Sequence, residues 1–254
     1  EVHLRLSPIP ESIMSAACHF PSLEDAVMTA QQVIQYGVPI ARIEMLNADQ
    51  MGISINYSKL KDIEAVPTLF FEFHGSESSN KENIKIVEEL SKDNNGSSFK
   101  WAKDLEERNK LWQARWDVYY SVKALNNNGR VYSTDVCVPI SKITECVKFA
   151  EEKAKEFGVR APMVGHMGDG NFHVVLPYDP AKKEMYKQIR AFNDTLIRKA
   201  LELNGTITGE HGVGLHKKEY LLEQHPDNIP VMKSIKRTLD PNNIMNPGKI
   251  FDLN

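Results

Sequence analysis

The sequence predicts an α+β fold, in which helices pack on an antiparallel or mixed β-sheet. Two observations support this class: a strand–helix–strand pattern occurs twice, and strand-like and helix-like segments are mixed along the whole chain. The chain has 254 residues and no low-complexity linker that would force a split. We therefore expect one unit with a sizeable core, spanning residues 1–254.

The first strand–helix–strand unit covers residues 13–46. Strand-like residues 13–20 (IMSAACHF) lead to Ser22, and a helical spacing of apolar residues then runs to Gly37. A second strand follows over residues 38–46 (VPIARIEML). Ser22 is predicted to be the N-cap, because its hydroxyl can accept a hydrogen bond from the first helical turn, and glycine commonly follows a helix end.

The second unit repeats this layout over residues 131–166. It has a strand at residues 131–138 (VYSTDVCV), a helix that runs to Gly158, and a strand at residues 159–166 (VRAPMVGH). Pro139 precedes this helix, and Ser141 is predicted to be its N-cap.

Four further elements complete the predicted order. The first is a strand at residues 68–75 (TLFFEFHG), and the second is a helix from about Lys81 to Asp93 that ends at the polar break 94–98. The third is a long helix from about Lys103 to Leu125. The fourth is a helix that begins at Asp179 and Pro180 and ends before Gly205, with an apolar stripe of Met185, Ile189, Phe192, Leu196, Ala200 and Leu203. Antiparallel sheets that contain two β-α-β-type units and are covered by helices are ferredoxin-like.

Composition narrows the functional classes. The net charge of −3 comes without a basic patch, so we expect no nucleic-acid partner. Cys18, Cys137 and Cys146 show no C-x-x-C spacing, which argues against disulfides and a cysteine zinc site and favours a reducing compartment. No apolar run approaches the roughly 18 residues of a membrane helix. Because the chain lacks an initiator Met and opens in strand-like alternation, we expect a piece of a longer protein, with any targeting peptide outside it.

The segment GHMGDGNFH, residues 165–173, places two histidines around a turn. Asp169 and Gly170 are a favoured central pair for a two-residue hairpin turn, which would make His166 and His173 direct cross-strand neighbours with Cβ atoms about 5 Å apart. Two neutral imidazoles at this separation suit one shared metal ion, because neighbouring cationic rings would repel each other. The alternative is that the rings merely line a polar cavity.

A third ligand is expected from TITGEHGVG, residues 206–214, where glycines permit a tight turn or a close backbone approach. His166, His173 and Glu210 would form a two-histidine, one-carboxylate site with open positions. His211 would be a free base beside it. The alternative is that this segment is only a turn.

Arg115, in KLWQARWDVYY, is predicted to lie on a helix among aromatic and apolar neighbours. It either covers the core with its stem or clamps an anion, since a guanidinium binds a carboxylate through two parallel hydrogen bonds. On these residues alone, the site could hold zinc for hydrolysis, ferrous iron for oxygen chemistry, or a metal that orients a hydroxy acid. Spacing does not choose between these chemistries.

Three motifs, GHMGDGNFH, TGEHGVG and the closing LDPNNIMNPGKIF, resemble the C-terminal half of flavin-linked D-2-hydroxy-acid dehydrogenases of the vanillyl-alcohol-oxidase type. ARIEML, PTLFFEFHGS and YSTDVCVPIS resemble the mitochondrial D-lactate dehydrogenase branch more closely, and the similarity spans about residues 4–251. The resemblance implies a cap domain whose N-terminal partner, absent from this chain, carries most of the FAD site. It also implies that Asn246, in the closing motif, lies near FAD.

The resemblance assigns further roles. It implies a divalent metal, zinc or manganese, on His166, His173 and Glu210. His211 would be the catalytic base, and Arg115 would hold the substrate carboxylate.

Two positions bear on the substrate. In the 2-hydroxyglutarate branch, a polar residue stands at the position of Val175 and a lysine at that of Ser133, and both help to hold a second carboxylate. Neither Val175 nor Ser133 would bind a second carboxylate in this way, so the expected substrate is D-lactate or a D-2-hydroxy acid with an apolar tail. The alternatives are D-2-hydroxyglutarate or glycolate as substrate, a stand-alone hydrolase-like metal-binding domain, and a non-catalytic interaction domain.

The expected reaction is oxidation of the hydroxy acid to the 2-keto acid once the chain is joined to its flavin domain. His211 would remove the hydroxyl proton as hydride passes to the flavin, and the electrons would leave for an acceptor such as cytochrome c. The chain alone is expected to be inactive and colourless. The resemblance further implies a mitochondrial location, and a homodimer is one expected assembly.

Overall fold

The first predicted strand–helix–strand unit is present in the computed structural model, which describes residues 1–6, 8–61, 63–125 and 129–253. It consists of β1 (Ser12–His19), α1 (Leu23–Gln35) and β2 (Arg42–Leu46). Both strands pair antiparallel with β3 (Thr68–Gly75), which lies between them. With α3 (Glu77–Asp93) and β4 (Ser97–Ala102), the order β4-β1-β3-β2 is that of a ferredoxin-like sheet.

The second unit forms a reduced copy of the same arrangement. Its elements are β5 (Arg130–Ser133), β6 (Val136–Cys137), the 3₁₀ turn η1 (Ile140–Lys142), α6 (Ile143–Glu156), β7 (Met163–His166), β8 (Asn171–Tyr178) and α7 (Lys183–Glu202). Strand β8 pairs with β7 on one side and with β5 and β6 on the other. A single bridge between Cys137 and Thr206 stands where a fourth strand would lie.

The two halves share one sheet. Strand β2 of the first half pairs antiparallel with β7 of the second, with Glu44 opposite His166 and Leu46 opposite Val164. This seam, defined as the β2–β7 pairing, makes the described strands one continuous sheet of eight. The predicted ferredoxin-like α+β fold is therefore confirmed, with both units in a single sheet.

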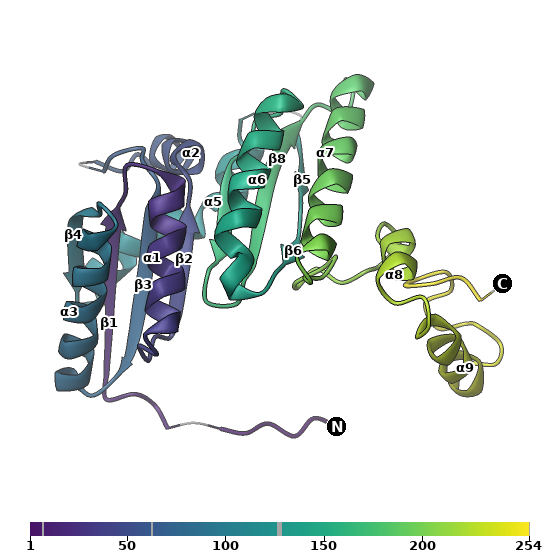
Figure 1. Cartoon of the computed structure of the whole chain (residues 1–254), viewed down its shortest axis with the longest axis horizontal. Coiled ribbons are helices and arrows are strands. Elements are labelled where there is room, and N and C mark those ends of the chain that lie inside the picture. The colour runs from purple at the N-terminus through teal and green to yellow at the C-terminus, as the bar shows by residue number, and fades with distance from the viewer. Residues whose placement is uncertain (7, 62, 126–128, 254) are drawn as a thin grey trace.

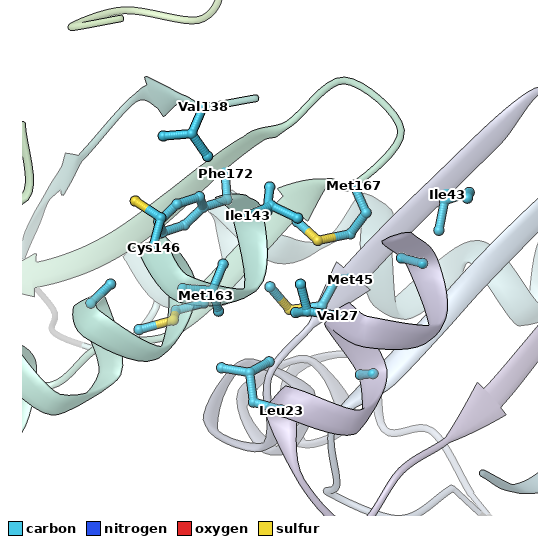
Figure 2. Close-up of a cluster of buried hydrophobic side chains, with 14 of the residues drawn as sticks. Leu23, Val27, Ile43, Met45, Val138, Ile143, Cys146, Met163, Met167 and Phe172 are labelled. Atoms are coloured by element: carbon cyan, nitrogen blue, oxygen red, sulfur yellow. The ribbon is translucent and has the colours of Figure 1, made fainter. Parts of the chain in front are cut away.

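The two faces of the sheet are covered by different helices. Helices α1, α3, α6 and α7 cover one face, and Leu23, Met45, Met163 and Phe172 belong to the buried apolar cluster there (Figures 1 and 2). On the other face lie α2 (Ala48–Ser58), α4 (Leu105–Trp116) and α5 (Val118–Lys123), with a smaller cluster around Trp112. Helices α8 (Lys218–Gln224) and α9 (Ile229–Leu239) form a C-terminal lobe beyond α7 (Figure 1).

Helix starts were predicted with mixed success. Ser22 is the N-cap of α1 and accepts a hydrogen bond from the Asp25 amide at 3.1 Å. Ser141 is not an N-cap, because it lies inside η1 and α6 begins only at Ile143. Helix α3 begins at Glu77 rather than near Lys81, since Ser76 caps it.

The structure corrects three further predictions and adds two elements. The long helix over residues 103–125 is interrupted at Asp117, which separates α4 from α5. Asp179 accepts a hydrogen bond from the Ala181 amide in a turn and does not cap α7, which begins at Lys183. The described residues among 1–11 form no strand. Helix α2 and strand β4 were not predicted at all.

The three cysteines are free thiols, as the absence of paired spacing predicted. Within the described ranges, no helix is both long and apolar enough to cross a membrane.

Candidate metal and substrate site

The histidine hairpin has a different register from the predicted one. His166 is the cross-strand partner of Asn171, and His173 is that of Val164, so residues 167–170 form a longer loop. Met167 explains the difference, because its side chain is fully buried in the core and its amide donates to Ile43 of β2. The register is displaced by two residues, an even number, so both histidines still point to the same face of the sheet.

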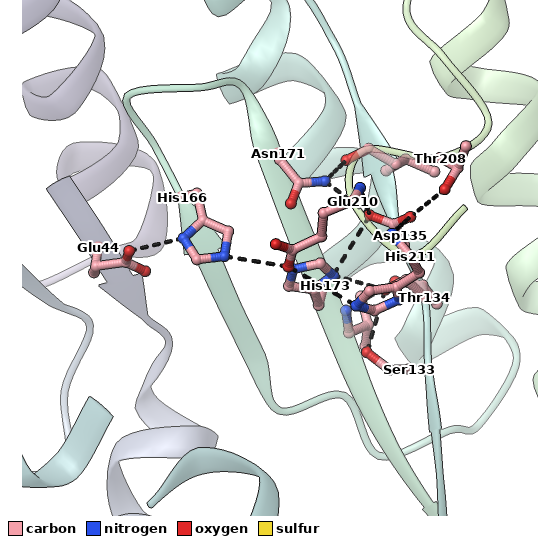
Figure 3. Close-up of polar contacts among 12 residues, drawn as sticks. Glu44, Ser133, Thr134, Asp135, His166, Asn171, His173, Thr208, Glu210 and His211 are labelled. Carbon is pink, nitrogen blue, oxygen red and sulfur yellow. Dashed lines mark hydrogen bonds and ion pairs between the residues drawn. The ribbon is translucent and has the colours of Figure 1, made fainter. Parts of the chain in front are cut away.

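Each histidine is oriented through its Nδ1 atom. His166 Nδ1 lies 2.7 Å from Glu44 Oε1 across the seam, and His173 Nδ1 lies 2.9 Å from the Thr134 carbonyl oxygen. A carbonyl oxygen only accepts, so Nδ1 of His173 carries the proton. Both Nε2 atoms are thereby directed toward Glu210, as Figure 3 shows.

Glu210 brings the predicted ligands together. Its Oε1 lies 2.9 Å from His173 Nε2 and 3.4 Å from His166 Nε2. The ring of His211 stacks on that of His173, with centroids 4.7 Å apart and planes 9° apart, and its Nε2 lies 3.8 Å from the same oxygen. The structure therefore places the three predicted ligands and the predicted base in one cluster.

Charge and burial differ between His166 and His173. The hydrogen bond to Glu44 raises the pKa of His166 against the opposing effect of burial. Burial lowers the pKa of His173, partly offset by the Thr134 carbonyl, so this ring is neutral near pH 7. Burial alone would raise the pKa of Glu44, but His166 and Arg115 together hold it below its usual value.

The donor set fits a metal ion. His173 Nε2 is buried, has no hydrogen-bond partner among the described residues and faces Glu210 Oε1. The lone pair of this nitrogen and that of the carboxylate oxygen therefore oppose each other unless a cation or a proton lies between them. Two ligand atoms that are each about 2.1 Å from one ion lie roughly 3.0–3.5 Å apart, which is close to the two distances to Glu210. One ligand atom from each of His166, His173 and Glu210 lies within 4.8 Å of the other two.

Asp135 holds the loop that carries Glu210 and His211. Its carboxylate is fully buried and accepts hydrogen bonds from the backbone amides of both residues, at 3.2 and 3.0 Å. Lys217 Nζ lies 3.0 Å away. Despite burial, these donors and Thr208 keep the pKa of Asp135 far below its usual range. Asp135 is therefore an anchor for the loop that carries Glu210 and His211.

Glycine is required where this loop passes β8. A Cβ atom at Gly209 would lie 2.0 Å from Asn171 Nδ2, and Gly212 has a φ of +73°. The predicted close approach and tight turn are both present in this segment.

Arg115 is linked to the histidines through Glu44. Its Nε donates to Glu44 Oε2 at 2.9 Å, while the other oxygen of that carboxylate holds His166. The side chain of Arg115 is only 22% exposed, and within the described residues its two Nη groups donate no hydrogen bond. These groups remain available to a carboxylate ligand.

Asn246 is not part of this cluster. It lies in the C-terminal lobe, at φ +48°, and lines an apolar groove of about 630 Å³ with Val213 and Ile235 among its residues. The amide of Ile250 donates to Gly214, so the closing segment packs next to the end of the Glu210 loop.

Sequence reasoning missed two carboxylates of the site. Glu44 is the lone acidic residue of the buried strand β2, and this placement was the available signal. Asp135 lies between β5 and β6, in a segment that was predicted as one uninterrupted strand. Their partners are distant in sequence: His166 is 122 residues from Glu44, and His211 is 76 residues from Asp135.

We expect Glu44→Gln to weaken metal binding by about 10–100-fold, because loss of a carboxylate behind a ligand histidine typically has this effect. A competitive titration against a chelator measures the affinity. Glu72→Gln is the matched control, since Glu72 is a similarly buried carboxylate on β3 that pairs with Arg42 and His74. Equal affinities in the Glu44 variant and the wild type would contradict this role for Glu44.

The fold has counterparts among solved structures. A 4-ethylphenol oxidase from Gulosibacter chungangensis has the same fold, with a TM-score of 0.70 at 16% identity over 98% of this chain and 56% of that chain. This neighbour confirms the predicted fold of the vanillyl-alcohol-oxidase type.

The chain belongs to the family of FAD linked oxidases, C-terminal domain, whose family model matches residues 9–250. It is 44% identical over 251 residues to a probable mitochondrial D-lactate dehydrogenase of Danio rerio, covering 98% of this chain and 50% of that protein. It is 36% identical over 252 residues to a mitochondrial D-lactate dehydrogenase [cytochrome] of Arabidopsis thaliana, covering 99% and 44%. The chain spans about half the length of the curated relatives it matches.

Proposed function

We propose that this chain is the substrate- and metal-binding half of an FAD-dependent dehydrogenase that oxidises D-lactate, or a related D-2-hydroxy acid, to the 2-keto acid. One observation carries the metal-binding part: the unpartnered Nε2 of His173 and the Nε2 of His166 both point at Glu210 Oε1. The names of the relatives support the substrate class.

The chain's own residues would bind and orient the substrate. The free Nη groups of Arg115 would bind the substrate carboxylate, while Glu44 keeps both Arg115 and His166 in place. His166, His173 and Glu210 would hold the divalent ion, zinc or manganese. When bound, the ion lowers the pKa of an alcohol oxygen and FAD accepts a hydride.

His211 is the proposed catalytic base. Its ring is 42% exposed and stacked on His173, so its outer face is open to a ligand at the site. It would take the hydroxyl proton of the substrate. The neutral His173 beneath it adds no second positive charge, which would otherwise oppose that protonation.

The side chains beyond His173 on this face of the sheet would favour a substrate with an apolar tail. Val175 is buried two residues along β8, on the same face, and Ser133 of β5 is its cross-strand partner. The Ser133 hydroxyl donates to the Thr134 carbonyl oxygen. Neither side chain carries a charge for a second carboxylate. Assays with D-lactate, glycolate and D-2-hydroxyglutarate on the full-length protein compare the alternatives directly.

The remaining parts of the proposal concern the whole protein. An N-terminal domain would hold most of the FAD, and the groove at Asn246, with its mainly apolar residues, would lie near it. Cytochrome c is the proposed electron acceptor, since the name of the Arabidopsis thaliana relative includes a cytochrome. The mitochondrion is the proposed location, since both relatives are named mitochondrial. A homodimer stays a prediction.

The metal content of the purified chain and of the full-length protein tests this proposal. We expect near-stoichiometric zinc or manganese by mass spectrometry, and its loss in the variant His166→Ala, His173→Ala. The matched control is His216→Ala, His225→Ala, which removes two histidines outside the cluster. If neither wild-type protein held metal, or if the control lost it equally, the proposed metal site would be wrong.

A further inference from the structure

A second pocket lies on the same face of the sheet as the histidine cluster. It has a volume of about 180 Å³, and its apolar floor includes Ala17, Met51 and Phe70. It is bounded by residues of β1, β3 and β4 and of helices α2 and α4, together with residues just after α2. None of the proposed metal ligands, nor His211 or Arg115, lines it.

The sheet register separates this pocket from the proposed metal site. Phe70 is the cross-strand partner of Glu44, Ala17 is that of Phe70, and Lys100 is that of Ala17. At about 4.8 Å per strand, Ala17 lies roughly 10 Å from Glu44 along this row. The pocket is therefore a neighbour of the histidine cluster and does not overlap it.

The pocket carries positive charge. Lys61, Lys100 and Lys110 line it, and no acidic residue does among those that the structure describes. Lys110 is paired with Glu106 at 2.9 Å. Lys100, in contrast, has no hydrogen-bond or ion-pair partner within the described residues. Among the described residues, an anion at the pocket would therefore meet at least one lysine, Lys100, without a hydrogen-bond or ion-pair partner.

His19 adds an unsatisfied polar atom. It ends β1 and lines the pocket, and its Nδ1 is buried without a hydrogen-bond partner among the described residues. Burial lowers the pKa of His19, with a nearby Glu64 opposing and Lys100 adding to the effect, so the ring is neutral. A buried polar atom without a partner is unfavourable, and a ligand in the pocket could supply the missing hydrogen bond.

We propose that this pocket binds a small amphipathic monoanion, a carboxylate with a short apolar tail. The lysines would attract the carboxylate, and Ala17, Met51 and Phe70 would cover the tail. The pocket volume of about 180 Å³ is small, which suits a short tail. This binding site does not depend on the proposed metal site.

Sodium hexanoate is the probe for the test. It is titrated into the 254-residue chain while NMR follows the imidazole resonances of His19. We expect a saturable shift whose affinity falls about twofold to fivefold in Lys100→Gln, the range for loss of an exposed ion pair. Lys85→Gln, an exposed lysine of α3 on the opposite face, should bind like the wild type.

Two further comparisons make the result decisive. Hexylamine has the same tail with the opposite charge and should not shift His19. Arg115→Gln should keep the His19 shift, because hexanoate held by Arg115 would belong to the histidine cluster instead. The proposal is overturned if hexanoate gives no saturable shift, if hexylamine binds equally well, or if Arg115→Gln abolishes the shift while Lys100→Gln leaves it intact.

Discussion

His211→Ala is expected to lower kcat of the full-length enzyme by about 10²–10⁴-fold, the range that general-base catalysis contributes. His211 stacks on His173, and its Nε2 approaches Glu210 no closer than 3.8 Å. Its loss should therefore remove the proposed proton acceptor and leave the three proposed ligand atoms in place. Steady-state kinetics with D-lactate measure kcat, and mass spectrometry of the same samples measures bound metal.

The controls for this variant separate catalysis from folding. His216→Ala, in a nearby exposed histidine, should keep the wild-type kcat. A near-normal kcat in His211→Ala would show that another group accepts the proton. Loss of metal in this variant would make His211 a ligand, because its ring also lies close to Asp135 and His173 in a possible ligand group.

Asp135→Asn is expected to lower the free energy of unfolding by about 3–5 kcal/mol, as happens when one partner of a buried ion pair is removed. Lys217, whose side chain is only 15% exposed, would keep its charge without the carboxylate. The amides of Glu210 and His211 would lose the anionic acceptor that fixes their loop. Metal affinity should fall in parallel. Urea unfolding of the chain, with and without metal, measures both effects.

Asp240→Asn is the matched control for this variant. Asp240 is also a buried aspartate that pairs with a lysine, Lys236, and accepts from two backbone amides, but it lies in the C-terminal lobe. It should reduce stability without changing metal affinity. If both variants weakened metal binding equally, a specific positioning role for Asp135 would be wrong.

The pH dependence of stability checks that the charge of Asp135 is responsible. The pKa of Asp135 is depressed in the folded state. Its contribution to the free energy of unfolding is therefore complete at pH values above the unfolded pKa of about 3.9, and it declines as the pH falls toward the folded pKa. The stability difference between the wild type and Asp135→Asn should therefore narrow below about pH 4. A difference that stayed constant down to acid unfolding would point to hydrogen bonding alone.

The repeated strand–helix–strand pattern of the fold could be predicted because its sequence signals are local. Helix α1 has an apolar stripe and a serine cap, and β3 is rich in apolar residues, so short windows of sequence contain the information. Helix α2 was missed because it is only weakly amphipathic, and β4 because it is a short edge strand with mostly exposed residues. Tertiary packing determines such segments more than local propensity does.

The site shows the same division between local and long-range information. The two histidines could be found because they flank a glycine-rich turn, and Glu210 because it stands between two glycines. The hairpin register could not be found this way, because it depends on Met167 entering a core built by other strands. The partners of Glu44 and Asp135 are set by contacts across the sheet, and a single sequence contains no direct record of those contacts.

The seam between β2 and β7 also has a thermodynamic consequence. The cluster draws on Glu44 from one half of the sheet, His166 and His173 from the other, and Glu210 from the loop after α7. An ion bound there would stabilise only the state in which all three parts are assembled. At a free ion concentration 100 times its Kd, this stabilisation is about 2.7 kcal/mol. Ligation would thus strengthen the thermodynamic coupling between two pseudo-repeated halves that already share one sheet.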